Sequence, residues 1–252
     1  LERWRPHHYV AYNHFHYDHV FRNSRLRSTG CKSWYYVHSV HDRCAFFYRS
    51  PDGPIRSKIA WTYLSYDQLV HWGARDMELY RNMAVRSCNY QVLGPLWAAE
   101  VWTSPRLRSL LEVKLGKVRT DPVVAVFDSS FGPGLPYGEE ALCEFFDALR
   151  GLMEHPGLSS LFLLYKPKND LAVLRECVSP ETAASLGGLL AHPRCLPLGV
   201  DITPGSVIAE ADLTISIAYT STTVEALGAR HRAIYFDPGG KFKESYYEQF
   251  PN

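Results

Sequence analysis

The sequence predicts an α/β fold built from two domains with parallel sheets. Three observations predict it: strand-like and helix-like apolar patterns alternate along the chain, the alternation occurs twice, and a linker-like stretch separates the two sets. A chain of 252 residues is long enough for two domains, which commonly contain about 100–150 residues each. With 46% hydrophobic and 21% charged residues, the composition excludes a disordered or fibrous protein.

The first set of elements lies within residues 1–102. The strand patterns HYVAYNHF and KSWYYVHSV flank the helix pattern DHVFRNSRLRSTG, in which Asp18 is the expected N-cap and Gly30 the expected C-cap. The strand patterns QLVHWG and YQVLGPL then flank the helix pattern ARDMELYRNMA. This β-α-β succession is typical of a parallel sheet covered by helices. The opening strands of such a domain are missing, so we expect an incomplete first domain in a chain cut from a longer protein.

The second set of elements lies within residues 103–252. We place the boundary after residue 102 because the next stretch, TSPRLRSLLEVKLGKVRTDP, contains two prolines and a run of cations. After it, the strand patterns VVAVFD, LFLLYKP, DLTISI and RAIYFD alternate with helix patterns over 139–154, 170–190 and 222–229. Right-handed crossovers would make this sheet parallel as well.

The charge balance differs between the two halves, although the net charge is only +1. Residues 1–120 contain 18 Lys and Arg against 9 Asp and Glu, whereas residues 121–252 contain 9 against 17. A basic first half, with Arg22, Arg25 and Arg27 at helical spacing, is expected to face an anion such as a phosphorylated substrate or a membrane surface. Nucleic acid is not expected, because the acidic half would repel a polyanion and no nucleic-acid-binding pattern is present. The alternative is that these charges only solvate the surface.

The cellular compartment follows from the cysteines and from the apolar runs. The six cysteines are scattered without a C-x-x-C pair, which favours reduced thiols in a cytosolic protein. No apolar run approaches the roughly 18 residues that span a bilayer. We therefore expect a cytoplasmic protein, with peripheral contact at the inner face of the membrane.

The stretch HFHYDH, residues 14–19, has the H-x-H-x-D-H spacing of metal ligands in metallo-β-lactamase-like hydrolases. Only thirteen residues precede it, and it continues into a cationic helix pattern that would oppose the binding of divalent cations. A zinc hydrolase is therefore the least favoured function, and we expect no metal site. The stretch is better explained by packing histidines or by a metal-free site at the carboxyl end of a strand.

Histidines lie at the ends of the first two predicted strands. An imidazole, with an unperturbed pKa of about 6.5, suits proton abstraction from a hydroxyl group. The candidate bases are His14, His16, His38 and His41. Asp18 or Asp42 is expected to replace or orient one of them. Each of these histidines could instead be structural.

The strongest functional pattern is ADLTISIAYTSTTVEALGARHRAIYFDP in the second half. A buried strand ends in a cluster of hydroxyl residues that opens a helix, so backbone N–H groups and hydroxyls form an anion site suited to phosphate. The residues expected at the phosphate are Ser221, Thr222 and Thr223, and Glu225 follows in the same helix as a further donor-binding candidate. Thr222 and Glu225 also fit a T-x-x-E capping box, which needs no ligand.

This segment resembles the nucleotide-sugar-binding domain of GT-B glycosyltransferases, which have two Rossmann-like domains, and in particular enzymes of bacterial surface polysaccharide synthesis. FDSSFGPG resembles the loop facing the nucleotide phosphates, and YFDPGG the loop closing over the nucleotide. YKPK lies where related sialyl and Kdo transferases carry His-Pro, so Lys166 stands in place of that His. The resemblance adds donor-binding candidates: Ser129, Ser130, Gly132, Gly134, Lys166 and Lys168.

The resemblance implies a metal-independent glycosyltransferase without a cofactor, acting between its two domains. The expected donor is a CMP-, CDP- or UDP-linked sugar, and the expected acceptor is a cell-surface glycan or a lipid-linked glycan. Three alternatives remain: a CDP-polyol phosphotransferase of the teichoic-acid type, a sugar epimerase, or a non-catalytic carbohydrate-binding or scaffold module.

Overall fold

A computed structural model describes residues 6–12, 18–37, 39, 64–83, 89–103, 121–132, 135 and 137–240. It separates into two compact units, and the described residues change from one to the other between Leu96 and Trp97. The structure groups helix α5 (Ala98–Thr103) with the second unit. The sequence-based boundary after residue 102 instead assigns most of this helix to the first domain.

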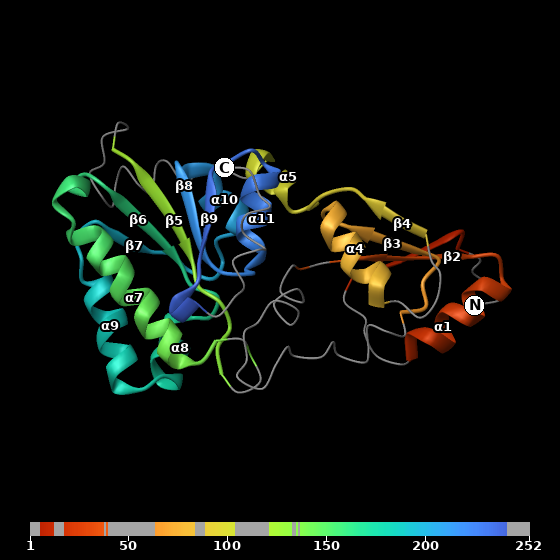
Figure 1. Ribbon diagram of the computed structural model, residues 1–252, viewed down its shortest axis with the longest axis horizontal. Helices are drawn as coiled ribbons and strands as arrows, with labels where there is room; N and C mark the ends of the chain where they lie inside the picture. Colours follow the sequence, from red (N-terminus) through yellow and green to blue (C-terminus); the bar gives the residue numbers. More distant parts are fainter. Residues whose placement is uncertain are drawn as a thin grey trace. The chain divides into compact units, whose positions relative to one another are not determined.

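The first unit contains a four-stranded parallel sheet with the order β1-β2-β3-β4 (Figure 1). The strands are β1 (His8–Ala11), β2 (Lys32–Tyr36), β3 (Gln68–His71) and β4 (Asn89–Val92). Helix α1 (Asp18–Ser28) joins β1 to β2, and α4 (Ala74–Met83) joins β3 to β4. Asp18 is the first helical residue rather than a residue before the helix. Gly30, at φ +80°, allows the chain to turn into β2.

The core of the first unit is rich in tyrosine. Tyr35 and Tyr66 are buried with their rings 5.1 Å apart, and Leu69 and Val37 pack in the same cluster. Aromatic rings pair favourably beyond the area that they bury, so this cluster stabilises a small sheet.

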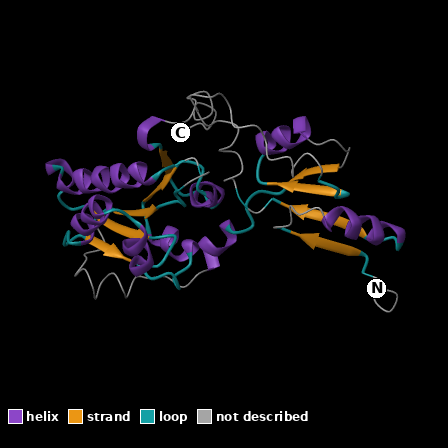
Figure 2. Cartoon of the chain, turned by 90° about the horizontal axis from the view of Figure 1, so that it is seen from below, coloured by secondary structure: helices purple, strands orange, loops and turns teal. Residues whose placement is uncertain are grey.

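The second unit contains a five-stranded parallel sheet with the order β7-β6-β5-β8-β9. The strands are β5 (Val123–Phe127), β6 (Phe162–Lys166), β7 (Cys195–Pro197), β8 (Leu213–Ile217) and β9 (Ala233–Phe236). All five residues of β5 are buried, as expected for the central strand of a sheet that is covered on both faces. Figure 2 shows the strands as a layer flanked by helices.

Helices α7 (Glu139–Glu154), α8 (Leu171–Cys177) and α9 (Pro180–Leu190) lie on one face of the second sheet, and α5, α10 (Pro204–Glu210) and α11 (Ser221–Gly228) lie on the other (Figure 1). Short 3-10 turns follow α7 (Pro156–Leu158) and β9 (Pro238–Gly240). The predicted helical stretch over 170–190 is divided because Ser179 caps a new helix that begins at Pro180. The predicted α/β fold with two parallel sheets is confirmed.

Candidate functional site

Three adjacent strands of the second sheet end together at one edge. Phe127, the last residue of β5, pairs with Lys166 at the end of β6 and with Ser216 near the end of β8. The turns that follow these strands therefore meet at the carboxyl edge, where open α/β sheets bind ligands. This brings the described residues 129–132 of the predicted 129–134 loop, the Lys166–Lys168 turn and the start of α11 to one edge.

The junction between β8 and α11 has an unusual backbone. Tyr219 is buried and has a φ of +63°, a left-handed conformation that is uncommon for a bulky residue. Thr220 is the N-cap of α11, but its hydroxyl donates to the Ile217 carbonyl at 2.6 Å instead of capping the helix. The start of α11 therefore lacks the side-chain cap that would compete with an anion for its N–H groups.

The capping box predicted for Thr222 and Glu225 is wrong. Thr222 is the second residue inside α11, and its Oγ1 lies 2.8 Å from Ser216 Oγ. Both side chains are buried, so this hydroxyl pair links the helix to strand β8. Ser221 is half-buried and Thr223 is buried at the same helix start.

Glu225 is a buried carboxyl group in the second turn of α11. Burial raises its pKa to about 7, and the nearby negative charge of Glu100 adds to the increase. A carboxyl group in this state holds a proton near neutral pH and can donate as well as accept a hydrogen bond.

Asp128, which the sequence-based prediction did not include, follows β5 directly and is 4% exposed. Its Oδ2 accepts a hydrogen bond from Tyr165 Oη at 2.7 Å, and its Oδ1 accepts one from the Lys168 backbone N–H at 2.7 Å. Burial raises the pKa of Asp128 to about 6, against the opposing effect of these bonds and of the two lysines. The only sequence signal for such a buried, hydrogen-bonded carboxyl group is an Asp at the carboxyl end of a buried strand.

The two predicted lysines differ in exposure. Lys166 is 8% exposed and its Nζ donates to the Pro167 carbonyl at 3.1 Å, whereas Lys168 is exposed. Burial lowers the pKa of Lys166, and the carboxylates of Asp128 and Asp201 oppose that decrease. The turn thus presents one buried and one exposed cation.

The loop after β5 carries the remaining predicted residues. Ser129 is buried, Ser130 is half-buried, and Gly132 has a φ of +127°, which only glycine adopts readily. Gly134 lies outside the described residues. The loop is tied to the end of β9, because Gly132 N–H donates to the Tyr137 carbonyl and Tyr137 Oη donates to Asp237 at 2.8 Å.

All four candidate bases, His14, His16, His38 and His41, lie outside the described residues. Asp18 is exposed at the start of α1, where a negative charge is favourable next to the helix N-terminus.

One further histidine, His71, is the last residue of β3, and it was not among the site residues predicted from the sequence. It is fully buried with its Nδ1 3.3 Å from Asp76, which also accepts the Trp72 N–H.

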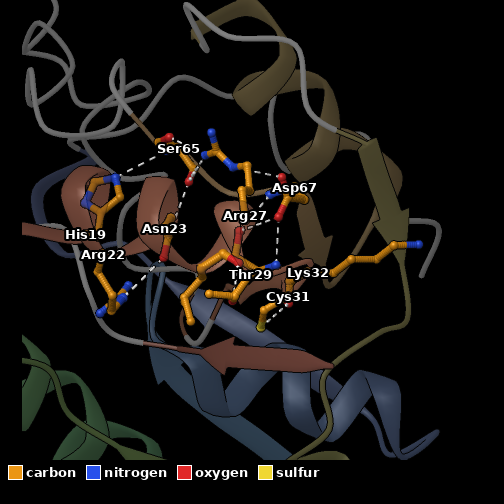
Figure 3. Close-up of polar contacts among 11 residues, drawn as sticks. His19, Arg22, Asn23, Arg27, Thr29, Cys31, Lys32, Ser65 and Asp67 are labelled. Carbon is orange, nitrogen blue, oxygen red and sulfur yellow. Dashed lines mark hydrogen bonds and ion pairs between the residues drawn. The ribbon is translucent and has the colours of Figure 1, made fainter. Parts of the chain in front are cut away.

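The predicted basic face of α1 is largely engaged within the first unit (Figure 3). Arg22 donates to Tyr66 Oη at 3.0 Å and lies over the Tyr9 ring. Arg27 donates to the carbonyl and hydroxyl oxygens of Ser65 and pairs with Asp67 at 3.0 Å. Arg25 is exposed, and among the described residues its side chain has no such contact.

His19 of the HFHYDH stretch is buried in α1, and its Nε2 accepts the Ser65 N–H at 3.2 Å (Figure 3). It therefore packs within the first unit. Among the residues that the structure describes, no three His, Cys, Asp or Glu side chains gather so that they could hold a metal ion. None of the described helices is long and apolar enough to cross a bilayer.

The model of one protein family, described as "Polysaccharide biosynthesis PFTS motif protein", matches residues 2–252. Among curated protein sequences, none matches this chain. HepE of Anabaena, solved with UDP and glucose, is 16% identical with a TM-score of 0.54, and 96% of this chain covers 62% of that protein. A UDP-forming α,α-trehalose-phosphate synthase from Burkholderia vietnamiensis is 11% identical with a TM-score of 0.51.

That alignment with the synthase covers 87% of this chain and 54% of the synthase. The chain thus spans little more than half of the length of these solved structures. They have the GT-B architecture, so the predicted arrangement of Rossmann-like parallel sheets is confirmed.

Proposed function

We propose that this chain, which belongs to the family of polysaccharide biosynthesis PFTS motif proteins, transfers a sugar from a nucleotide-sugar donor to a glycan acceptor. The observation that carries the proposal is the carboxyl edge of the second sheet. Two lysines follow β6 and the uncapped start of α11 follows β8, on either side of the central strand β5. Such groups suit a nucleotide's phosphates, and they can stabilise the phosphate that leaves on sugar transfer.

The family's name supports a functional site at the same carboxyl edge of the second sheet. Read as one-letter amino-acid codes, the PFTS of the name shares an aromatic-Thr-Ser sequence with two segments of this chain, VWTS at 101–104 and AYTS at 218–221. Of these, only AYTS follows a strand and opens a helix at the carboxyl edge. It also contains the left-handed Tyr219, and backbone strain of this kind is found preferentially at functional sites.

The proposed donor site consists of the 129–134 loop, Lys166, Lys168 and the start of α11, with Glu225 near the ribose. A UDP-linked sugar is the favoured donor because HepE was solved with UDP-glucose as well as with UDP and glucose. The chain's own cations supply the positive charge, so we propose a reaction that requires neither a metal nor a cofactor.

The proposed base belongs to the first unit. His14 and His16 follow β1 in the sequence, and His38 and His41 follow β2. The proposed acceptor is a lipid-linked glycan bearing phosphate, reached by a cytoplasmic protein in peripheral contact with the inner face of the membrane. The excess of cations over residues 1–120 supports an anionic acceptor.

Thermal-shift measurements with CMP, CDP, UDP and GDP test this proposal, because a nucleotide that binds only the folded chain raises its unfolding temperature. We expect UDP to stabilise the wild type and to have a much smaller effect on the K166M/K168M variant. The K32M variant, which loses an exposed lysine of the first unit, is the matched control and should respond like the wild type.

Two of the alternatives give their own results in the same screen. Stabilisation by CDP alone would favour polyol-phosphate transfer. If none of the four nucleotides stabilises the wild type, the chain is a scaffold or carbohydrate-binding module and the proposal is wrong.

A further inference from the structure

We infer that Asp128 is a positioning residue that holds the Lys166–Lys168 turn in place for the donor's phosphates. The inference rests on the proposed function, since it names a residue that prepares the same site. Asp128 is not in a position to act directly on substrate in this structure, because both carboxylate oxygens are engaged and the side chain is 4% exposed.

The first argument is geometric. The two groups that bond Asp128 lie on either side of Lys166 in the sequence: the Tyr165 hydroxyl before it and the Lys168 N–H after it, each at 2.7 Å. A single carboxylate thus holds both ends of the turn against the neighbouring strand β5. Both bonds need an acceptor, and only a carboxylate offers two acceptor oxygens. Asparagine has one neutral acceptor oxygen and could only donate to the Tyr165 hydroxyl, so it loses both hydrogen bonds to a charged acceptor.

The second argument concerns the charge of Lys166. An ammonium group has three N–H donors, and among the described hydrogen bonds Lys166 makes one, to the Pro167 carbonyl. Burial lowers the pKa of this group, and the Asp128 carboxylate is the first of two that raise it again. Asp128 therefore helps to keep a buried cation charged while its remaining donors are available for a phosphate.

A simple charge effect predicts the opposite result for removal of Asp128. Neutralising a carboxylate close to a phosphate site makes the site more positive, which by itself would tighten the binding of an anion. Weaker binding after the D128N substitution would consequently report the loss of what Asp128 does for the turn and for the charge of Lys166, and not the direct effect of removing a negative charge.

The test uses the full chain and UDP as the probe, with the dissociation constant measured by calorimetry. We expect D128N to bind UDP about tenfold more weakly, because it replaces two hydrogen bonds to a charged acceptor with weaker neutral ones. The matched control is D212N, which makes the same chemical change at the amino end of β5, where Asp212 accepts the Val123 N–H at 2.8 Å. D212N should bind UDP like the wild type. Equal or tighter binding by D128N would overturn the inference.

A second measurement separates this inference from the proposed function. Hydrogen exchange at the Lys168 amide, followed by NMR without ligand, should be slow in the wild type and in D212N and faster in D128N. If UDP does not bind the wild type but the amide responds in this way, the proposed function fails while Asp128 still holds the turn. Unchanged exchange in D128N would refute the positioning role.

If D128N does not fold, Y165F serves in its place. It removes one of the two bonds and keeps the carboxylate, so we expect UDP binding about two- to threefold weaker. Wild-type affinity in Y165F would then count against the inference.

Discussion

The hydroxyl groups of Ser216 and Thr222 lie 2.8 Å apart in the interior, and they join the end of strand β8 to the first turn of helix α11. The helix start that we assign to the donor phosphates is thus fixed to the sheet by a side-chain bond.

The first prediction follows from this pair. T222V keeps the shape of the side chain but leaves the buried Ser216 hydroxyl without its partner, so we expect a loss of about 1–3 kcal/mol in the free energy of unfolding. The S216A/T222V double variant removes both polar groups and should recover much of that loss. Urea denaturation of the wild type, T222V, S216A and the double variant measures the coupling. Additive effects of the two substitutions would mean that the hydroxyl pair contributes nothing.

The second prediction concerns the pH dependence of stability. The pKa of Glu225 is about 7 in the folded chain against an ordinary value of 4.5, so the folded state keeps its proton longer than the unfolded state. Stability in the wild type therefore falls as pH rises from about 4.5 to about 7. E225Q has no such proton, and it should gain up to about 3 kcal/mol relative to the wild type between pH 4.5 and pH 8.

Denaturation of both proteins across this pH range measures the difference. E100Q provides a control, because it removes the like charge that contributes to the raised pKa. The loss of stability between pH 4.5 and pH 7 should be smaller in E100Q than in the wild type. Parallel pH profiles for the wild type and E225Q would contradict the prediction.

The third prediction concerns Arg27, whose guanidinium group bonds Ser65 and Asp67 at the same time (Figure 3). Lysine keeps the charge but lacks the planar set of donors that makes these contacts. We expect R27K to lose about 1 kcal/mol of stability, nearly as much as R27A, since the site is partly exposed. R25K, on the exposed side of the same helix, should leave stability unchanged. An R27K variant as stable as the wild type would show that charge alone matters.

The fourth prediction tests membrane contact by co-sedimentation with anionic and neutral vesicles at low salt. Because Arg27 is paired with Asp67 whereas Arg25 is exposed, R25Q should weaken binding to anionic vesicles more than R27Q does. Binding should fall steeply with salt, since exposed charges are screened beyond about 8–10 Å at physiological ionic strength. Equal or absent binding to both kinds of vesicle would argue against a membrane role.

The fold could be predicted where apolar patterns are long. Strands β5, β6 and β8 were predicted from short apolar runs, and helix α7 was predicted from the helical spacing of its apolar residues. Strand β7 was not predicted, because it has only three residues and includes Pro197. Helix α10 was also not predicted, since its seven residues begin with Pro-Gly.

The site was predicted less completely, because its contacts link residues far apart in the sequence. The run Thr220–Thr223 has four hydroxyls, and the sequence alone does not show that Thr220 is the N-cap while Thr222 turns inward to Ser216. Asp128 contacts Tyr165 and Lys168 across 37 and 40 positions. Such pairing depends on which strands become neighbours, and local patterns do not encode that order.

The close contact between α10 and α5 has a consequence for dissecting the chain. A methyl group on Gly205 would come within 2.9 Å of the Glu100 backbone carbonyl carbon and 3.1 Å of the Val101 nitrogen, so the two helices meet backbone to backbone. Ala98 and Val101 of α5 are also buried in one cluster with Val207 and Ile208 of α10. An expressed fragment that begins at β5 would therefore expose the apolar surface of α10 that α5 buries, and it should aggregate. A fragment that begins at Trp97 keeps α5 and should remain soluble.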